Sequence, residues 1–152
     1  ILQDADGLQL AIDEMQHFVE EVACDVICGT ESRGFIFGMP IAYNLHKPFV
    51  PIRKKGKLPL ETIEESYDLE YGSATIEMHK DSIKPGQKVV IIDDLIATGG
   101  TVEACAKMIE RLGGEAVAVE GGAVQREEDR AGHDAPRVGR DARAGPEKCI
   151  EC

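Results

Sequence analysis

Apolar residues recur at intervals of three and four near the start of the chain. The positions that follow this spacing are Leu8, Ala11, Ile12, Met15, Phe18, Val19 and Val22. Side chains at this spacing fall on one face of a helix, so the pattern predicts a helix over residues 8–22. Asp6 precedes the apolar positions and is the predicted N-cap.

Short apolar runs then alternate with helical patterns. Strands are predicted at residues 26–29, 49–55, 88–94 and 115–124, and helices at 35–45 and 101–112. Strands that are apolar on both faces and alternate with helices indicate a parallel sheet covered on both sides. The predicted fold class is therefore α/β, with a Rossmann-like parallel sheet flanked by helices.

Two segments depart from this alternation. Residues 58–83 mix acids, β-formers and a Tyr-Gly pair, which predicts a hairpin or loop excursion rather than a core element. A long excursion of this kind is often a functional lid. Residues 125–152 contain no Leu, Phe or Tyr, and we expect this polar tail to be mostly loose. The predicted domain is residues 1–124.

Composition limits the possible functions. A formal net charge of −11 argues against a protein that binds nucleic acid through its phosphates, since such affinity needs clustered Lys and Arg. We expect no membrane span, because no apolar run approaches the roughly 18 residues that one requires, and no leader is evident. The expected location is the cytoplasm. In this acidic chain the dense basic cluster at residues 53–57 is conspicuous.

Cysteine and histidine offer little chemistry. Cys24, Cys28 and Cys105 lie in apolar stretches, where a buried thiol behaves as a small hydrophobe. Cys149 and Cys152 form a single CxxC, which without a second pair does not favour a zinc or redox site. The four histidines have neither metal-ligand spacing nor a nucleophile partner.

The segment "VVIIDDLIATGGT" at residues 89–101 places small and hydroxyl residues directly before a helix. The first N–H groups of a helix lack partners inside it and favour an anion such as a phosphate. Gly99 and Gly100 let the backbone approach that anion closely, and Thr98 and Thr101 add hydroxyl donors. A plain glycine-rich turn is the alternative, although it does not account for the acids ahead of it. No Walker loop and no GxGxxG after a strand is present.

Asp93 and Asp94 are adjacent, and successive strand residues point to opposite faces, so both cannot be core residues. We expect them where the strand leaves the sheet, addressing sugar hydroxyls, a metal ion or a developing cation. Helix capping with solvent exposure is the alternative. The polar loops at residues 30–34, 53–57 and 93–101 all follow strands, so they should share the carboxyl edge of the sheet, where ligands bind.

The same segment closely resembles the phosphoribosyl-pyrophosphate signature of type I phosphoribosyltransferases, and "ATGGT" is similar to its adenine-specific version. Three further segments agree with the family pattern: "ESRGFIFG" at residues 31–38, "IRKKGKLP" at 52–59 and "SYDLEYG" at 66–72. The similarity runs from about residue 1 to about residue 119 in the right order.

The resemblance implies a role for each matching residue. Asp93 and Asp94 would engage the ribose hydroxyls, directly or through Mg²⁺, and stabilise an oxocarbenium-like ribose, and Glu70 is a candidate acid toward the purine. The implied phosphate and substrate contacts are Ser32, Arg33, Arg53, Lys54 and Lys57 for pyrophosphate, Ala97, Thr98, Gly99, Gly100 and Thr101 for the 5-phosphate, and Tyr71 beside Glu70 in the flexible loop. An acidic solvated hairpin is the alternative for the Glu70 region. Family members often carry a cis peptide in the first loop, here at Glu31-Ser32.

The implied reaction converts adenine and phosphoribosyl pyrophosphate to AMP and pyrophosphate with Mg²⁺, in an enzyme that commonly forms homodimers. Adenine-specific members carry an N-terminal hood segment with a Phe-Arg-Asp motif, and this chain begins after it. The polar end also departs from the family's apolar-rich continuation. Two alternatives stay open: specificity for hypoxanthine, xanthine or orotate, and a non-catalytic module that binds phosphoribosyl pyrophosphate.

Overall fold

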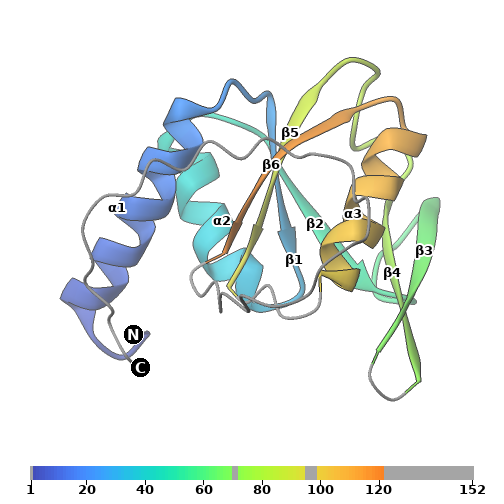
Figure 1. Ribbon diagram of the computed structural model, residues 1–152, viewed down its shortest axis with the longest axis horizontal. Coiled ribbons are helices and arrows are strands. Elements are labelled where there is room, and N and C mark those ends of the chain that lie inside the picture. The colour runs from blue at the N-terminus through green and yellow to red at the C-terminus, as the bar shows by residue number, and fades with distance from the viewer. Residues whose placement is uncertain (1, 70–71, 95–98, 122–152) are drawn as a thin grey trace, which may run out of the picture.

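The computed structural model describes residues 2–69, 72–94 and 99–121, and Figure 1 shows how their helices and strands are arranged. Helices and strands alternate along most of the chain, as the hydrophobic pattern predicts. The elements are α1 (Ala5–Glu21), β1 (Val26–Thr30), α2 (Arg33–Asn44), β2 (Phe49–Lys54), β3 (Thr62–Asp68), β4 (Ser73–His79), β5 (Lys88–Asp93), α3 (Gly100–Arg111) and β6 (Glu115–Gly121).

The strands form one six-stranded sheet in the order β3-β4-β2-β1-β5-β6. The four strands β2, β1, β5 and β6 are parallel, as predicted. The hairpin β3–β4 is antiparallel and joins the sheet through a short ladder in which Arg53 pairs with Glu77 and Lys54 with Ile76. The sheet is therefore mixed, and its parallel part carries the predicted α/β architecture.

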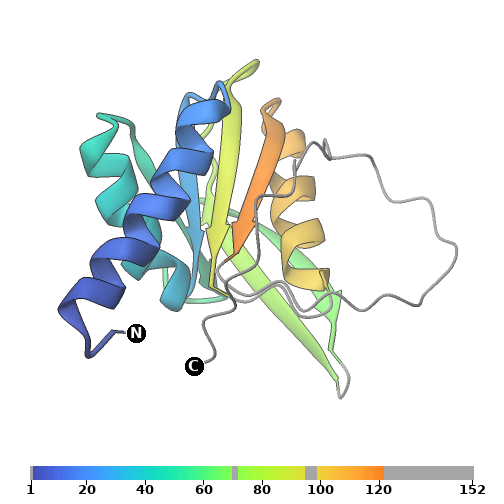
Figure 2. The ribbon, with the colours of Figure 1, turned by 60° about the vertical axis from the view of Figure 1, so that its left-hand side comes forward.

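Helices cover both faces of the parallel strands. Figure 2 shows α1 and α2 on one side of the sheet and α3 on the other. Alternate residues of β5 divide between the two layers: Val90 and Ile92 pack toward α1 and α2, while Val89 and Ile91 pack toward α3. All four are fully buried, which explains why this strand is an uninterrupted aliphatic run.

Two predictions about local structure were wrong. The N-cap of α1 is Asp4 rather than Asp6, because the Asp4 side chain accepts a hydrogen bond from the Asp6 N–H at 3.2 Å and the helix starts at Ala5. Residues 58–83 do form a hairpin, but this hairpin is not excluded from the core. Since β4 lies between β3 and β2, Ile76 and Met78 are buried under α3.

The cysteine prediction is confirmed for three of the five thiols. Cys24, Cys28 and Cys105 are buried and unpaired among the described residues, and burial raises the pKa of Cys105 to about 12. A thiol that stays protonated is a packing group rather than a nucleophile. Cys149, Cys152, His133 and the polar tail lie outside the described residues. Within the described ranges, no helix is long and apolar enough to cross a membrane.

Candidate active site

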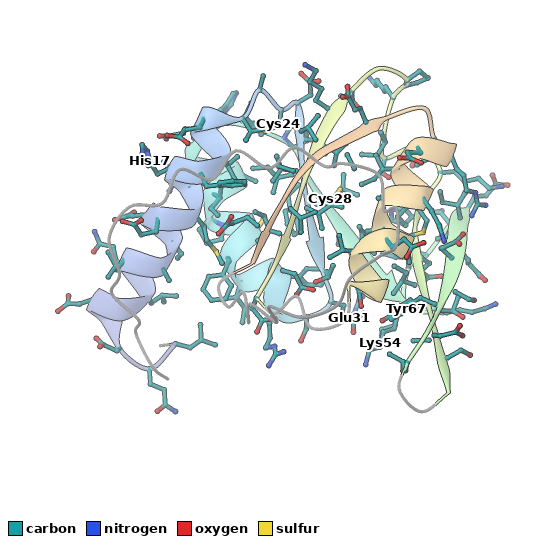
Figure 3. The ribbon with its side chains drawn as sticks, in the orientation of Figure 1. His17, Cys24, Cys28, Glu31, Lys54 and Tyr67 are labelled. Carbon is teal, nitrogen blue, oxygen red and sulfur yellow. The ribbon has the colours of Figure 1, made fainter. Side chains whose placement is uncertain are left out.

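The carboxyl ends of β1, β2 and β5, with the described residues next to them, meet at one edge of the sheet, as predicted for polar segments that follow strands. They surround a hollow of about 200 Å³. In Figure 3, Glu31, Lys54 and Tyr67 lie together at this edge, away from Cys24 at the other end of the sheet. The hollow is lined by Thr30, Glu31, Ser32, Arg33, Ile52, Lys54, Tyr67, Ile76, Asp93, Asp94 and Thr101.

Asp93 is the last residue of β5, where it is half-buried beside the hollow. Its Oδ1 accepts the Asp94 N–H at 2.9 Å, and the Thr30 hydroxyl donates to the same carboxylate. Burial raises the pKa of Asp93, and the charge of Asp94 acts in the same direction, while the two hydrogen bonds partly oppose them. A carboxylate in this environment gains stability when a positive charge or hydroxyl donors approach it.

Asp94 turns out of the strand, so the two acids do occupy the exit from the sheet. Its Oδ2 lies 2.7 Å from Nε of Arg33, which begins α2. The Arg33 side chain is 60% exposed, and an ion pair that is open to water contributes little stability. Arg33 can therefore leave Asp94 for an anion at little cost.

Glu31 gathers the cations of the basic loop. Its Oε2 accepts the Arg53 Nε–H at 3.3 Å and the Lys54 N–H at 3.0 Å, and its Oε1 pairs with Nζ of Lys57. Partial burial opposes ionisation of Glu31, but the hydrogen bonds and the charges of Lys57 and Arg53 outweigh it and hold its pKa below the ordinary value. The peptide bond that follows, Glu31-Ser32, is cis, which confirms the expectation for this loop.

The predicted pyrophosphate contacts are thus brought together, but only some of them line the hollow. Ser32, Arg33 and Lys54 line the hollow directly. Arg53 and Lys57 instead form ion pairs with Glu31 at the wall of the hollow. The neighbouring Lys55 pairs with Glu64 of β3 at 2.7 Å and does not line the hollow.

The start of α3 has the features that a phosphate site requires. Gly99 is the N-cap in a left-handed conformation with φ of 79°, and a Cβ there would meet no atom within 4 Å. The N-cap Gly99 makes no side-chain cap, and within the described residues the N–H groups at Gly100 and Thr101 could receive an anion. Thr101 also lines the hollow.

The acids at the end of β5 fit a shared magnesium site rather than a closed metal cage. Within the described ranges, no cluster of three or more His, Cys, Asp or Glu side chains could hold an ion. Mg²⁺ prefers oxygen ligands and is commonly held by one or two carboxylates together with substrate phosphates. Asp93 and Asp94 supply such a donor set beside the hollow.

Some of the predicted site residues fall outside the part of the chain that the structure describes, and some site residues were not predicted. Glu70, Tyr71, Ala97 and Thr98 lie outside the described residues. The missed residues are Thr30, Glu31 as a side chain, Tyr67 and Glu77. Thr30 is the last residue of the buried strand β1 and Glu31 directly follows it, a position that could have identified them. Tyr67 and Glu77 lie in the hairpin, whose place in the sheet no local pattern indicates.

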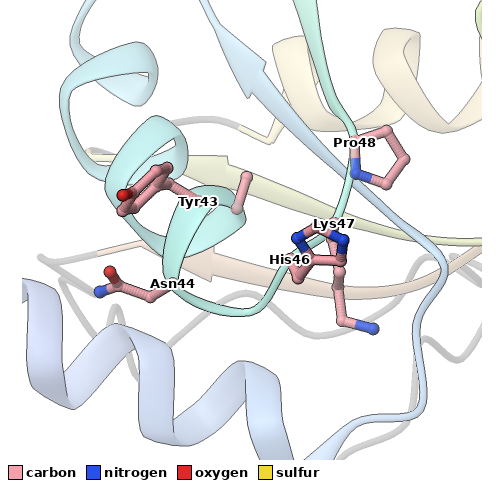
Figure 4. Close-up of a pocket in the computed structure, with 6 residues that line it drawn as sticks. Tyr43, Asn44, His46, Lys47 and Pro48 are labelled. Atoms are coloured by element: carbon pink, nitrogen blue, oxygen red, sulfur yellow. The ribbon is translucent and has the colours of Figure 1, made fainter.

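A second and larger hollow of about 750 Å³ lies at the opposite edge of the sheet. Figure 4 shows its lining at the end of α2 and the start of β2, with Tyr43, Asn44, His46, Lys47 and Pro48. It contains no carboxylate and none of the predicted site residues. Its size therefore does not make it the site, because the convergent charged groups lie at the other edge.

Comparison with known proteins agrees with this geometry. The family model of the phosphoribosyl transferase domain matches residues 9–132. A relative named adenine phosphoribosyltransferase, from Agathobacter rectalis, is 69% identical over 117 residues, which cover 77% of this chain and 67% of the relative. The chain therefore spans about two thirds of that relative's length.

Solved structures show the same fold. The adenine phosphoribosyltransferase of Thermoanaerobacter pseudethanolicus has a TM-score of 0.75 at 48% identity, and the match covers 78% of this chain and 69% of that one. The Trypanosoma brucei enzyme, solved with AMP, pyrophosphate and ribose-5-phosphate, has a TM-score of 0.73 at 32% identity, with 80% and 53% covered. The chain therefore belongs to the phosphoribosyltransferase family and, within it, to the adenine phosphoribosyltransferases.

Proposed function

We propose that this chain transfers the phosphoribosyl group of phosphoribosyl pyrophosphate to adenine, giving AMP and pyrophosphate in purine salvage. The observation that carries the proposal is the convergence of Asp93, Asp94, Arg33 and Lys54 on one hollow beside the open start of α3. Acids for a ribose, cations for a pyrophosphate and backbone N–H groups for a phosphate are the groups that this substrate requires. Its relatives are named for adenine, which supports that base.

Asp93 and Asp94 act on the ribose in this proposal. As the bond from the ribose to pyrophosphate breaks, positive charge develops on the ring, and two carboxylates fixed at the end of a rigid strand stabilise it. Asp93 is suited to this role because burial raises its pKa, so its carboxylate gains stability when positive charge develops beside it. The 5-phosphate is held by residues 97–101, of which Gly99, Gly100 and Thr101 form the start of α3.

Ser32, Arg33, Arg53, Lys54 and Lys57 bind and stabilise the departing pyrophosphate. Arg33 and Lys54 line the hollow, which supports direct contact. Arg53 and Lys57 are placed at the wall by Glu31 and exchange that partner for phosphate oxygens. Glu70 is the proposed acid toward the purine nitrogen, and Tyr71 lies beside it in the sequence. Closure of their loop would exclude water from the reactive ribose.

Mg²⁺ is the proposed cofactor. Asp93 and Asp94 would hold it, directly or through water, in company with the ribose hydroxyls and phosphate oxygens of the substrate. When bound, the ion supplies charge neutralisation to the pyrophosphate leaving group. The transferase site falls within the proposed domain of residues 1–124.

The test is AMP formation from adenine and phosphoribosyl pyrophosphate with Mg²⁺, with hypoxanthine, xanthine and orotate assayed alongside. Turnover with adenine alone supports the proposal. Turnover with another base assigns that specificity instead. No turnover with any base, together with retained binding of phosphoribosyl pyrophosphate, favours the alternative of a non-catalytic binding module.

We also propose that the chain acts as a homodimer in the cytoplasm. An exposed apolar stripe at helical spacing supports the dimer: Ile36, Met39 and Tyr43 of α2 are 40%, 54% and 84% exposed. Tyr43→Glu should shift the mass measured by light scattering toward the monomer. Leu60→Glu, at an isolated loop residue that is 90% exposed, is the matched control and should leave the mass unchanged. An unchanged mass in the Tyr43 variant would exclude this face as the dimer interface.

The proposed location in the cytoplasm has separate support: unpaired cysteines among the described residues are compatible with a reducing compartment.

A further inference from the structure

A buried acid anchors the basic loop that follows β2. Glu77 in β4 is 3% exposed, and it is the one charged side chain buried to this degree in the described part of the chain. The antiparallel register sets Glu77 opposite Arg53, one residue before β2 ends. Its carboxylate therefore lies where the strand gives way to the loop of residues 55–58.

Most partners of this carboxylate are backbone groups, and the Thr62 hydroxyl donates to Oε2 at 3.5 Å. Oε1 accepts the N–H of Lys57 at 2.8 Å and the N–H of Leu58 at 2.7 Å, and the Gly56 N–H also donates to Glu77. Gly56 has a φ of 84°, a left-handed conformation in which glycine is unstrained. Successive N–H groups that converge in this way form a concave anion site, here filled by an acid of the protein itself.

Glu77 does not neutralise the cations of the loop. None of the ion pairs among the described residues includes it, whereas Lys55 pairs with Glu64 and Lys57 pairs with Glu31. Burial opposes its ionisation, but hydrogen bonds from backbone N–H groups and from the Thr62 hydroxyl prevail and hold the pKa of Glu77 below its ordinary value. The ionised acid thus binds the main chain of the loop and leaves its lysine side chains for other partners.

We propose that Glu77 is a positioning residue for the pyrophosphate site. It holds the main chain of the loop so that Lys57 reaches Glu31 at the wall of the hollow. The role in pyrophosphate binding rests on the proposed function, although the anchoring of the loop does not. Glu77 acts through the loop and touches no substrate, since it does not line the hollow.

The anchoring is tested by hydrogen exchange on the full chain without ligand. In Glu77→Ala the amides of Lys57 and Leu58 should exchange about tenfold faster or more, equal to about 1.4 kcal/mol of lost local protection. Glu77→Gln keeps an acceptor oxygen without the charge and should fall between this variant and the wild type. Glu61→Gln removes an equal charge from a pair exposed to water and should leave these amides unchanged.

The functional consequence is tested by calorimetric titration with inorganic pyrophosphate and by steady-state kinetics. Glu77→Ala should weaken pyrophosphate binding and raise the KM for phosphoribosyl pyrophosphate about tenfold, with the KM for adenine unchanged and with partial rescue in Glu77→Gln. General destabilisation would lower the active fraction and kcat without raising the KM for phosphoribosyl pyrophosphate relative to the KM for adenine. If Glu77→Ala does not fold, Glu77→Gln carries both tests.

The outcomes separate the two proposals. Unchanged exchange at Lys57 and Leu58 in the folded variants would overturn the anchoring. Accelerated exchange with unchanged pyrophosphate affinity, in a protein whose wild type binds pyrophosphate, would overturn the positioning role. Failure of the wild type to bind pyrophosphate or to make AMP would count against the proposed function instead, and the exchange measurement would still decide whether Glu77 anchors the loop.

Discussion

Gly34 lies where α2 presses against the two strand ends that carry the site. A Cβ added to Gly34 would meet the carbonyl oxygen of Ile92 at 2.5 Å and Oγ1 of Thr30 at 3.0 Å. Ile92 directly precedes Asp93, and the Thr30 hydroxyl donates to Asp93. Gly34→Ala must therefore displace either the start of α2 or the end of β5, because the nearest atom belongs to the backbone and cannot rotate away.

Two effects of opposite sign decide the size of the loss. Overpacking of a core costs about 1–3 kcal/mol, and alanine in a helix returns about 0.5–1 kcal/mol relative to glycine. Since the clash is with backbone, we expect a net loss of about 1–2 kcal/mol in the free energy of unfolding. For a chain of 152 residues this corresponds to a Tm lower by about 2–8 °C.

Urea denaturation and thermal unfolding of Gly34→Ala measure this loss, with Gly38→Ala as the matched control. Both glycines are buried in α2, but the nearest atom to a Cβ at Gly38 is the ring carbon Cε2 of Phe49 at 2.8 Å. A ring edge can shift, so Gly38→Ala should lose less stability. A Gly34 variant as stable as the wild type, or one no less stable than the Gly38 variant, would refute the reasoning.

Three further outcomes are expected. Asp94→Asn should lower kcat for AMP formation about a hundredfold or more while leaving the unfolding transition nearly unchanged; near-normal turnover would remove Asp94 from the mechanism. Glu31→Gln should lose stability relative to wild type at about pH 7, and the difference should shrink as the pH falls below 4.5, because a lowered acid pKa gives stability that is lost on protonation. Urea titrations across this range measure the difference, and a gap that widens in acid would contradict it. Lys54→Ala should raise the KM for phosphoribosyl pyrophosphate about tenfold, whereas Lys55→Ala should change it less than about twofold; equal effects would show that position at the hollow does not matter.

The parallel part of the fold was predictable because its signals are local. The aliphatic run of β5 is buried on both faces, and that burial leaves a direct trace in the sequence. The place of the hairpin was not predictable in the same way. Ile76, Glu77 and Met78 are all buried, yet an acid between two apolar residues is the ordinary pattern of a strand with one face in water. Glu77 is buried only because β4 pairs with β2, a strand distant in the sequence.

The site shows the same division. The positions of Asp93 and Asp94 follow from the alternation of side chains along β5, and the open start of α3 follows from the glycines before it. The role of Glu31 does not follow from the local sequence. Its partners Arg53 and Lys57 lie more than twenty residues away and approach it only when β1 and β2 pair. Sequence reasoning found the cations but not the acid that holds them.

The ion pairs of the site favour exchange with a ligand. Arg33 is paired with Asp94, and Lys57 with Glu31, so these cations are oriented without a ligand even though the chain carries a net charge of −11. The Arg33 side chain is 60% exposed, and an ion pair open to water contributes about 0–1 kcal/mol, so releasing Arg33 from Asp94 costs little. A charged hydrogen bond to a phosphate oxygen in a water-excluded site is worth about 1.5–3 kcal/mol, which exceeds that cost. Pyrophosphate should therefore displace Asp94 from Arg33, and the released Asp94 would become available to the ribose when the leaving group is bound.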